Sequence, residues 1–395
     1  MKICIVTPEY PPDQWGGLAR TVERVAVHLR DMELEVHIAH FSIVDAPVVL
    51  LDENRLDERM EDIKVHRIRV GREDISNRMP TIWDSPFTRT FKMMFQSLEM
   101  LHAEERFACL HSFFLFPTGY VTGILARKSA TPSVLTIVGN DIYKYPFSPD
   151  KSAMCRSGLE NADRVVALSQ DLLDTADGLY PVKGKGHVVY NAVEIPESAW
   201  VRADRERFHI GCAGIFKYAK GLPYLIKAVA QLRKQYPVTL ELLGEIRDTE
   251  SKAFHYMVEK SGIGDVLVRR PAVPHQEVSA WFLGLDVFVL PSVSEGCPNI
   301  LMEAMAAGLP CVATDVGAVT VLMQDGISGF VLPKGRADVL AAAIERILLL
   351  PDRGQSLGAS ARKRMRAFSR ARERMAWQGI YRDLIHPLAD CHQQW

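Results

Sequence analysis

The chain has 395 residues, of which 48% are hydrophobic and 24% are charged, close to the averages of soluble globular proteins. A single small module and a mainly disordered chain are therefore excluded, and two domains are the default expectation at this length. Lysine and arginine total 47 against 48 for aspartate and glutamate. This balance argues against a general electrostatic grip on nucleic acid.

Cysteine use and apolar runs bear on where the protein works. The seven cysteines are scattered, odd in number and never spaced as C-x-x-C, a pattern typical of reduced thiols in a cytoplasm. No apolar run approaches the roughly 20 residues that cross a bilayer. The apolar start at 3–6 is interrupted at Thr7 and Pro8, too early for a signal peptide. We therefore expect a cytoplasmic protein.

Short apolar runs alternate with helical patterns along the first half. Residues 2–7 are predicted as a buried strand, followed by a loop rich in proline and glycine and by a helix over about 18–30. Further strands are expected at 35–41, 65–70, 108–112, 133–137 and 164–168, with a helix near 119–127. This alternation predicts a parallel sheet covered by helices on both faces.

The same alternation then restarts. Strands are predicted at 209–213, 239–243, 287–290 and 311–314, with a helix at 222–235. The segment 190–196 and the polar stretch after it form the expected linker, so we place the domains at 1–196 and 197–375, with a C-terminal helix over 376–395 that packs back on the first domain. Two doubly wound domains facing each other would create a ligand cleft at the carboxyl ends of their strands.

Two further patterns have competing interpretations. A basic cluster precedes Trp377, and a solvated helical face is favoured over weak peripheral contact with anionic lipid at the inner face of a membrane. Its members are Arg362, Lys363, Arg364, Arg366, Arg370, Arg372 and Arg374. An aromatic stripe is favoured as core packing over an acceptor-binding or membrane-facing role. It consists of Trp83, Phe87, Phe91, Phe95 and Leu98.

The densest chemical signal is the segment 291–308, P-S-V-S-E-G-C-P-N-I-L-M-E-A-M-A-A-G, which joins a predicted strand to a predicted helix. Pro298 suits the first helical turn, and Gly308 with Pro310 ends the helix. The free N–H groups and the positive dipole end of this helix follow directly after a strand, so an anion would be stabilised there.

Two carboxylates, Glu295 and Glu303, bracket this helix start and are eight residues apart. Carboxylates accept hydrogen bonds from vicinal hydroxyls, so acids beside an anion site indicate a nucleotide ribose or a sugar. For an arbitrary pair of glutamates, compensation of the helix dipole and simple solvent exposure are the alternatives.

Two other loops carry weaker signals. In the strand, loop and helix start at 211–222, Lys217 and Lys220 could place two ammonium groups on one anion, although a solvent-exposed lysine is the ordinary alternative. In the first loop, Gly16 and Gly17 would let backbone N–H groups approach a phosphate or sugar, although most such pairs are turns.

These motifs together resemble the family 4 retaining glycosyltransferases of the GT-B fold. Glu295 and Glu303 form an E-x7-E element within S-E-G-x-P-x-x-x-x-E-A-x-A-x-G, accompanied by the K-G-L loop at 220–222 and the glycine pair. The N-A-V at 191–193, the D-V-G at 315–317 and the D-G-I-S-G-F at 325–330 resemble further family segments. The resemblance spans nearly the whole chain. It implies two Rossmann-like, doubly wound parallel-sheet domains facing across a cleft.

The resemblance also implies residue roles. Glu303 would bind ribose hydroxyls and Glu295 the donor-sugar hydroxyls, while Lys220 would hold the diphosphate. Backbone N–H groups would assist from Gly17 across the cleft and from the segment Gly296, Cys297, Pro298, Asn299 and Ile300. We expect Lys217 to supply the charge of a family arginine, because Ile215 stands in its place. Val138 replaces a family histidine or arginine, and the following Asn140 and Asp141 are further candidates facing the cleft.

The implied activity is metal-independent transfer of a hexosyl group, with retained configuration, from a nucleotide sugar, UDP- or GDP-linked, to a glycan, lipid-linked or small-molecule acceptor, as in polysaccharide biosynthesis. No D-x-D or histidine cluster suggests a metal, and no cofactor is expected. A dehydrogenase is disfavoured because no G-x-G-x-x-G follows a predicted strand, and the G-K-G at 184–186 precedes one. A glycosidase would not need a site for a charged leaving group. A sugar-nucleotide epimerase and a non-catalytic nucleotide-sugar binder remain alternatives.

Overall fold

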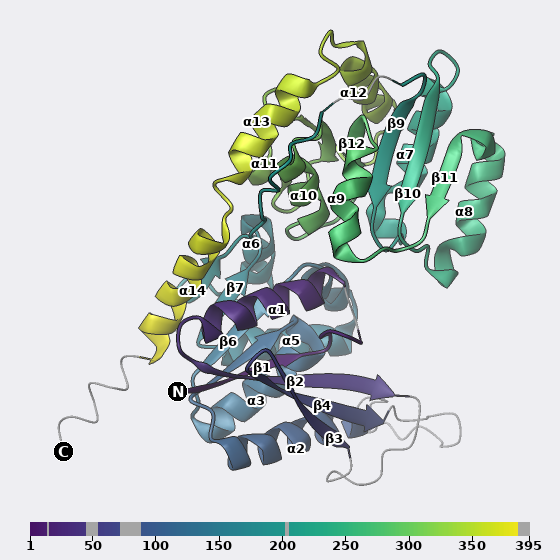
Figure 1. Ribbon diagram of the computed structural model, residues 1–395. Helices are drawn as coiled ribbons and strands as arrows, with labels where there is room; N and C mark the ends of the chain where they lie inside the picture. The colour runs from purple at the N-terminus through teal and green to yellow at the C-terminus, as the bar shows by residue number, and fades with distance from the viewer. Residues whose placement is uncertain (14–15, 45–53, 72–87, 202–204, 386–395) are drawn as a thin grey trace, which may run out of the picture. The chain divides into compact units, whose positions relative to one another are not determined.

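The computed structural model describes residues 1–13, 16–44, 54–71, 88–201 and 205–385. The chain divides there into two compact units (Figure 1). The first comprises Met1–Val189 together with the chain from Glu373 onward, and the second comprises Tyr190–Arg372. Each unit is built around its own sheet, and each is described below by itself.

The first unit holds a sheet whose described strands run in the order β3-β4-β2-β1-β5-β6-β7-β8. All neighbouring pairs are parallel except β3 and β4, and in the register Ile3 lies opposite both Val36 and Cys109. The predicted parallel sheet is confirmed, but the antiparallel edge strand β3 was not expected. The strands are β1 (Lys2–Thr7), β2 (Glu35–Val44), β3 (Arg55–Met60), β4 (Ile63–Gly71), β5 (Cys109–Phe113), β6 (Ser133–Ile137), β7 (Arg164–Ala167) and β8 (Gly186–Val188).

The longer helices of the first unit bury apolar residues in its core. In α1 (Gly17–Arg30) the buried face includes Val22, Val25 and Leu29. In α2 (Thr88–Glu105) Phe91 and Leu98 are buried, which confirms core packing for this part of the aromatic stripe, whereas Trp83 and Phe87 lie outside the described residues. The other helices are α3 (Tyr120–Ser129), α4 (Asn140–Lys144), α5 (Pro149–Asn161), α6 (Gln170–Leu179) and α14 (Arg370–Ile385), with short turns η1 (Leu115–Gly119) and η2 (Tyr145–Phe147).

The second unit holds a sheet in which every described neighbouring pair is parallel, in the order β11-β10-β9-β12-β13-β14. Counted along the chain this is the order 3-2-1-4-5-6 of a doubly wound sheet, with its reversal between β9 and β12. Two short strands, β11 and β14, were not predicted. The strands are β9 (Phe208–Ala213), β10 (Val238–Leu243), β11 (Leu267–Arg270), β12 (Val287–Leu290), β13 (Cys311–Thr314) and β14 (Phe330–Leu332).

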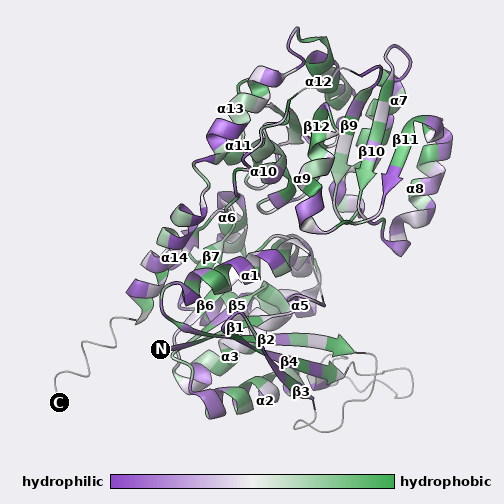
Figure 2. Cartoon of the chain, viewed as in Figure 1, coloured by the Kyte–Doolittle hydropathy of each residue, from purple (hydrophilic) through white to green (hydrophobic). Residues whose placement is uncertain are grey.

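Alternate residues of the second sheet face different helical layers. Leu240, Leu242 and Val289 join one buried cluster with α7 and α12, whereas Phe288 packs against Phe282 of α9 on the other face, with ring centroids 5.7 Å apart. Most strands of this sheet are correspondingly hydrophobic, whereas the edge strand β11 ends in two arginines (Figure 2). The helices are α7 (Leu222–Leu232), α8 (Asp248–Ser261), α9 (His275–Leu283), α10 (Asn299–Ala307), α11 (Val319–Leu322), α12 (Ala337–Leu349) and α13 (Gln355–Met365), with short turns η3 (Tyr218–Lys220) and η4 (Gly264–Val266).

The last helix, α14, returns the chain to the first unit. Trp377 and Tyr381 are buried in that unit's core, and the Tyr381 hydroxyl lies 2.7 Å from Nδ1 of His111. Burial lowers the pKa of His111 to about 3, so the imidazole is neutral. None of the described helices is both long and apolar enough to span a bilayer.

The basic cluster ahead of Trp377 is only partly a solvated face. Arg362 donates to the carbonyl oxygen of Ala306, and Arg364 donates to that of Leu322, so the expectation of a solvated face is wrong for these two residues. The side chains of the other members are exposed: Lys363, Arg366, Arg370, Arg372 and Arg374.

A buried carboxylate, Glu373, ties α14 to α1. Its Oε2 accepts from Arg24 Nε at 2.7 Å and lies 3.1 Å from Nε2 of His28, and the Glu373 side chain is 2% exposed. Burial alone would raise the pKa of Glu373, but the hydrogen bond with His28 and the charge of Arg24 hold it below its ordinary value.

We therefore predict that Glu373→Gln destabilises the first unit by about 1.5–3 kcal/mol at pH 7, because the buried hydrogen bond from Arg24 loses its charged acceptor. A carboxylate with a lowered folded-state pKa stabilises the fold above its unfolded pKa, about 4.3, and that stabilisation is lost as the pH falls through the folded pKa. Thermal unfolding from pH 7 to pH 3 should thus show the difference between variant and wild type shrinking with acid. The exposed Glu259→Gln is the control, and a constant difference across this range would contradict the assignment.

Candidate functional site

The predicted site residues of the second unit lie after the carboxyl ends of two adjacent strands, β9 and β12, in the loops there and in α10. The loop after β9 carries Lys217 and Lys220, and the loop after β12 carries Glu295 and leads into α10. The strand order reverses between β9 and β12, which is the position where open α/β sheets bind ligands.

Lys220 and Glu295 form an ion pair at this position. Lys220 Nζ lies 2.6 Å from Glu295 Oε1, and the hydroxyl of Ser292 donates to the same oxygen at 2.7 Å. The two charged side chains are only 18% and 14% exposed, so solvent screens the pair less than it would a surface pair. The sequence predicted both residues, and the structure adds that they are direct partners, 75 residues apart along the chain.

The loops that carry this pair approach each other through glycines. A Cβ on Gly221 would lie closer than 3.0 Å to the carbonyl oxygen of Pro291, so the loop after β9 fits against the loop after β12 only without a side chain. A Cβ on Gly244, in the loop after β10, would likewise lie closer than 3.0 Å to the carbonyl oxygen of Gly214, in the loop after β9. Both Gly221 and Gly244 also have positive φ, +66° and +124°.

A third glycine supports the backbone of Glu295 itself. Gly317, in the loop after β13, has φ +55°, and a Cβ there would lie closer than 3.0 Å to the carbonyl oxygens of Glu295 and Gly296. The neighbouring Ala318 N–H donates to Gly296 O at 2.8 Å. Loops after four adjacent strands, β10, β9, β12 and β13, are thus packed backbone to backbone around the ion pair.

The start of α10 supplies backbone N–H groups that are candidate hydrogen-bond donors to an anion. Pro298 is the N-cap and Gly308 the left-handed C-cap, so the predicted boundaries hold to within a residue. Asn191 Nδ2, 1% exposed as a residue, donates to Cys297 O at 3.1 Å and to Asn299 Oδ1 at 2.8 Å, which fixes the turn before the helix.

One part of the prediction for this turn is wrong. Pro298 has no N–H and can donate no hydrogen bond, so the donors of the segment are the amides of Gly296, Cys297, Asn299 and Ile300. The first amides of a helix have no acceptor within the helix.

Three further positions singled out in the sequence of the second unit lie around this pair of loops and α10. Glu303 lies within α10 and is half-buried. Lys217 is half-buried, and its carbonyl accepts the Lys220 N–H at 2.8 Å, which closes the turn η3 that presents Lys220. Ile215 is exposed.

In the first unit, Gly16 and Gly17 begin α1 directly after the loop that follows β1. Gly16 is the N-cap with extended backbone, φ −67°, and a Cβ there would lie 3.2 Å from the Glu9 carboxylate. A side chain at this position would therefore meet only the movable end of the Glu9 side chain, and the backbone conformation does not require glycine.

Asp141 is completely buried and binds backbone amides. Its carboxylate accepts from Leu115 N at 2.9 Å, Gly139 N at 2.8 Å and Val138 N at 3.4 Å, joining the loops after β5 and β6. Burial raises the pKa of Asp141 in spite of these hydrogen bonds. The side chain of Asn140 lies outside what the structure describes.

One group of described residues could offer ligands to a metal ion: His37 of β2, His66 of β4 and Glu105 of α2, with ligand atoms within 4.8 Å of one another. The sequence did not reveal it because the three come from separate elements. His37 Nδ1 lies 2.9 Å from His66 Nε2, and Lys2 Nζ lies 2.5 Å from Glu105. These mutual contacts satisfy the group as a polar network, and we assign no metal to it.

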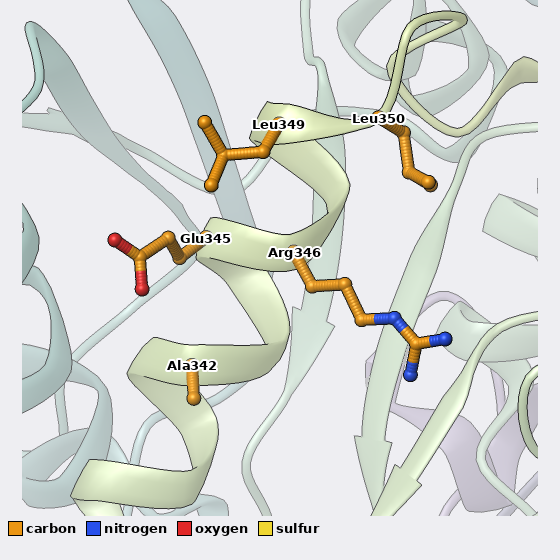
Figure 3. A pocket seen from close by; sticks show the side chains of 5 residues that line it. All are labelled: Ala342, Glu345, Arg346, Leu349 and Leu350. Atoms are coloured by element: carbon orange, nitrogen blue, oxygen red, sulfur yellow. The ribbon is translucent and has the colours of Figure 1, made fainter.

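A hollow beside α12 is not a candidate site. It is lined by Ala342, Glu345, Arg346, Leu349 and Leu350, whose side chains project from both sides of the helix (Figure 3). Glu345 accepts from the Tyr236 hydroxyl at 2.7 Å, and the Arg346 guanidinium lies 4.6 Å from the Phe330 ring centroid. Both charged groups are thus engaged by the fold, and none of the predicted site residues lines the hollow.

Two family models match the chain. Residues 15–196 match the model "Glycosyltransferase Family 4", and residues 198–364 match the model "Glycosyl transferases group 1". This chain belongs to the family 4 glycosyltransferases of the GT-B fold. The predicted fold class, with two α/β domains built on largely parallel sheets, is confirmed.

Individual relatives are more distant. The D-inositol 3-phosphate glycosyltransferase of Paenarthrobacter aurescens is 32% identical over 157 residues, which is 38% of this chain and 38% of that protein. The matches to the first such relatives span less than half of their length. Sucrose-phosphate synthase from Thermosynechococcus elongatus has a similar structure, with a TM-score of 0.80 and 19% identity over 98% of this chain and 99% of that one. The structure of the Anabaena HepE protein in complex with UDP-glucose is also similar, with a TM-score of 0.74 and 18% identity over 97% of this chain and 99% of that one. Both similarities concern the fold.

The glycine packing can be tested with a matched pair of variants. Gly317→Ala and Gly326→Ala both place a side chain at a left-handed position, φ +55° and +70°, but only the former meets backbone, since nothing lies within 4 Å of a Cβ at 326. We expect Gly326→Ala to cost about 1–2 kcal/mol of stability and leave donor turnover near wild type. Gly317→Ala should displace Glu295 and lower turnover on the order of 100-fold.

The readouts are thermal unfolding and kcat with a sugar nucleotide. Equal effects of the two alanines on kcat would show that the close approach of Gly317 does not position Glu295.

Proposed function

We propose that this glycosyltransferase moves a hexosyl group from a UDP- or GDP-sugar to a hydroxyl of a glycan, lipid-linked or small-molecule acceptor, with retention of anomeric configuration and without a divalent metal. The observation that carries the proposal is the convergence of the Lys220–Glu295 pair and the α10 start at the reversal point of the second sheet. The Anabaena HepE structure with UDP-glucose supports a nucleotide-sugar donor by analogy of fold.

The positive groups of the site suit a departing diphosphate. The Lys220 ammonium and the amides at 296–297 and 299–300 would carry the negative charge that grows on the leaving oxygen, and Lys217 would add a second ammonium. Each well-placed donor of this kind is worth roughly 3–4 kcal/mol of barrier lowering. Together these ammonium and amide groups would supply the positive charge that a metal ion supplies in other enzymes whose leaving group is a phosphate or diphosphate.

The carboxylates of Glu295 and Glu303 suit the uncharged hydroxyl groups of the donor. Glu295 would accept hydrogen bonds from hydroxyls of the sugar and Glu303 from those of the ribose, because vicinal hydroxyls are donors that match a carboxylate. The acceptor would be held mainly by the first unit.

The proposed chemical step is a displacement on one face of the sugar. The bond from the anomeric carbon to the diphosphate oxygen breaks, the bond from that carbon to the acceptor oxygen forms on the same face, and the acceptor proton passes to the departing diphosphate. Both products are then balanced, and no covalent sugar–enzyme intermediate is required. Analysis of the product would separate this reaction from donor isomerisation by an epimerase or from binding without turnover.

We also propose that the protein works in the cytoplasm, in a polysaccharide pathway. The described cysteines, which are free and buried, are consistent with a reducing compartment: Cys4, Cys109, Cys155, Cys212, Cys297 and Cys311. The exposed basic members of the cluster at 363–374 are the candidates for weak peripheral contact with anionic lipid.

The diphosphate role of Lys220 predicts a selective loss. Lys220→Ala should lower turnover of a sugar nucleotide by about 100- to 1000-fold, because the departing diphosphate loses its ammonium partner. Some folding stability should also be lost, because Glu295 loses a largely buried counter-charge although it keeps the Ser292 hydrogen bond. Lys227→Ala, at an exposed position of α7, is the control. Steady-state kinetics and thermal unfolding measure the two effects, and wild-type turnover in Lys220→Ala would remove the residue from the site.

Nucleotide selectivity can be read from thermal shifts with UDP, GDP, ADP and their sugars. A ligand at 100 times its dissociation constant adds about 2.7 kcal/mol of stability. One base should stabilise the chain, and Glu303→Ala should reduce that shift because a ribose contact is lost, whereas Glu259→Ala should not. If no nucleotide raises the unfolding temperature, the proposed donor class is wrong.

A further inference from the structure

One oxygen of the Glu295 carboxylate has two donors. Oε1 accepts from Lys220 Nζ at 2.6 Å and from Ser292 Oγ at 2.7 Å. Sequence reasoning gave Ser292 no role, although it stands in the motif three residues before Glu295. The structure shows that this serine is completely buried, so its hydroxyl is there for a partner inside the protein.

Ser292 is itself held in place from a neighbouring strand. Its carbonyl oxygen accepts the hydroxyl of Thr314, the last residue of β13, and Thr314 is 4% exposed. The serine backbone is therefore fixed between β12 and β13, and its hydroxyl has a defined direction toward Glu295.

A bound sugar nucleotide would affect the two donors to Glu295 Oε1, Lys220 Nζ and Ser292 Oγ, differently. A pyrophosphate carries more charge than a carboxylate and would compete with Glu295 for the Lys220 ammonium. The Ser292 hydroxyl is buried and neutral and would stay where it is. A carboxylate with one oxygen anchored keeps its plane and can offer its second oxygen to a sugar hydroxyl.

We propose that Ser292 is a positioning residue. It holds the Glu295 carboxylate in the orientation that binds the donor sugar, while the Lys220 ammonium exchanges its partner, Glu295, for the pyrophosphate of the donor. The inference rests on the proposed function, since it needs both a pyrophosphate and a sugar in the site. It implies that Ser292 acts on the sugar end of the donor and has no effect on the nucleotide end. A merely structural serine would affect both ends alike.

The test compares Ser292→Ala with Ser328→Ala, using UDP and UDP-glucose, or the corresponding GDP pair if the thermal shifts select guanine. Ser328 is a matched control because it is also buried, with its hydroxyl accepting Gln324 N–H at 2.8 Å, but it does not contact Glu295. We expect Ser292→Ala to lower kcat/KM for the sugar nucleotide tenfold or more and to leave the affinity for the nucleoside diphosphate, measured by calorimetry, within twofold of wild type. Ser328→Ala should change neither.

A double-mutant cycle with Glu295→Gln separates positioning from packing. If Ser292 acts through Glu295, adding Ser292→Ala to Glu295→Gln should cost far less than it costs alone. Ser292→Thr, which retains the hydroxyl, should restore most of the activity lost in the alanine variant. Additive losses, or equal weakening of UDP and UDP-glucose in Ser292→Ala, would overturn the inference.

The same experiment distinguishes two failures. If Lys220→Ala and Glu295→Gln abolish turnover but Ser292→Ala leaves kcat/KM unchanged, only the role of Ser292 is wrong. If all three variants keep wild-type turnover, the proposed function of the site is wrong, and with it this inference.

Discussion

The close backbone packing of the loops at the carboxyl end of the second sheet is the constraint on which the site depends. Gly221 against Pro291, Gly317 against Glu295 and Gly296, and Gly244 against Gly214 leave no room for a Cβ, so the loops after β9, β10, β12 and β13 form one closely packed support. That support sets the positions of Lys220 and Glu295, two long side chains that would otherwise lose considerable entropy on pairing. Positioning of this kind is what a site needs if charge stabilisation is its main contribution to catalysis.

The sheet topology explains why these particular loops meet. In the strand order β11-β10-β9-β12-β13-β14 the chain moves outward in one direction from β9 and in the other from β12, yet β9 and β12 are neighbours, so the loops that follow them meet at the point of reversal. The loop after β12 leads directly into α10, and the free amides at the start of that helix therefore lie beside both loops. A positive helix end, an ammonium and a carboxylate are thereby placed close together.

Much of this could be predicted from the sequence, and the exceptions have physical reasons. The strands at 2–7, 133–137, 287–290 and 311–314 agree residue for residue, because buried parallel strands are continuous apolar runs. The edge strand β3, R-L-D-E-R-M, is exposed and charged, so no apolar pattern marks it, and β14 has only three residues. In the site, Lys220 and Glu295 were predicted from local motifs. The contact of Ser292 with Glu295 and the fit of Gly317 depend on where neighbouring strands end, which no local pattern encodes.

In the proposed site the nucleotide sugar is held by the loops after β9 and β12 and by the first turn of α10. Hydrogen exchange of the full chain, followed by mass spectrometry with and without a saturating nucleoside diphosphate, tests this placement of the donor. We predict new protection in peptides covering 214–221 and 291–301, with the α12 segment at 342–350 unchanged. Protection confined to other segments, with these two loops exchanging as fast as before, would contradict it.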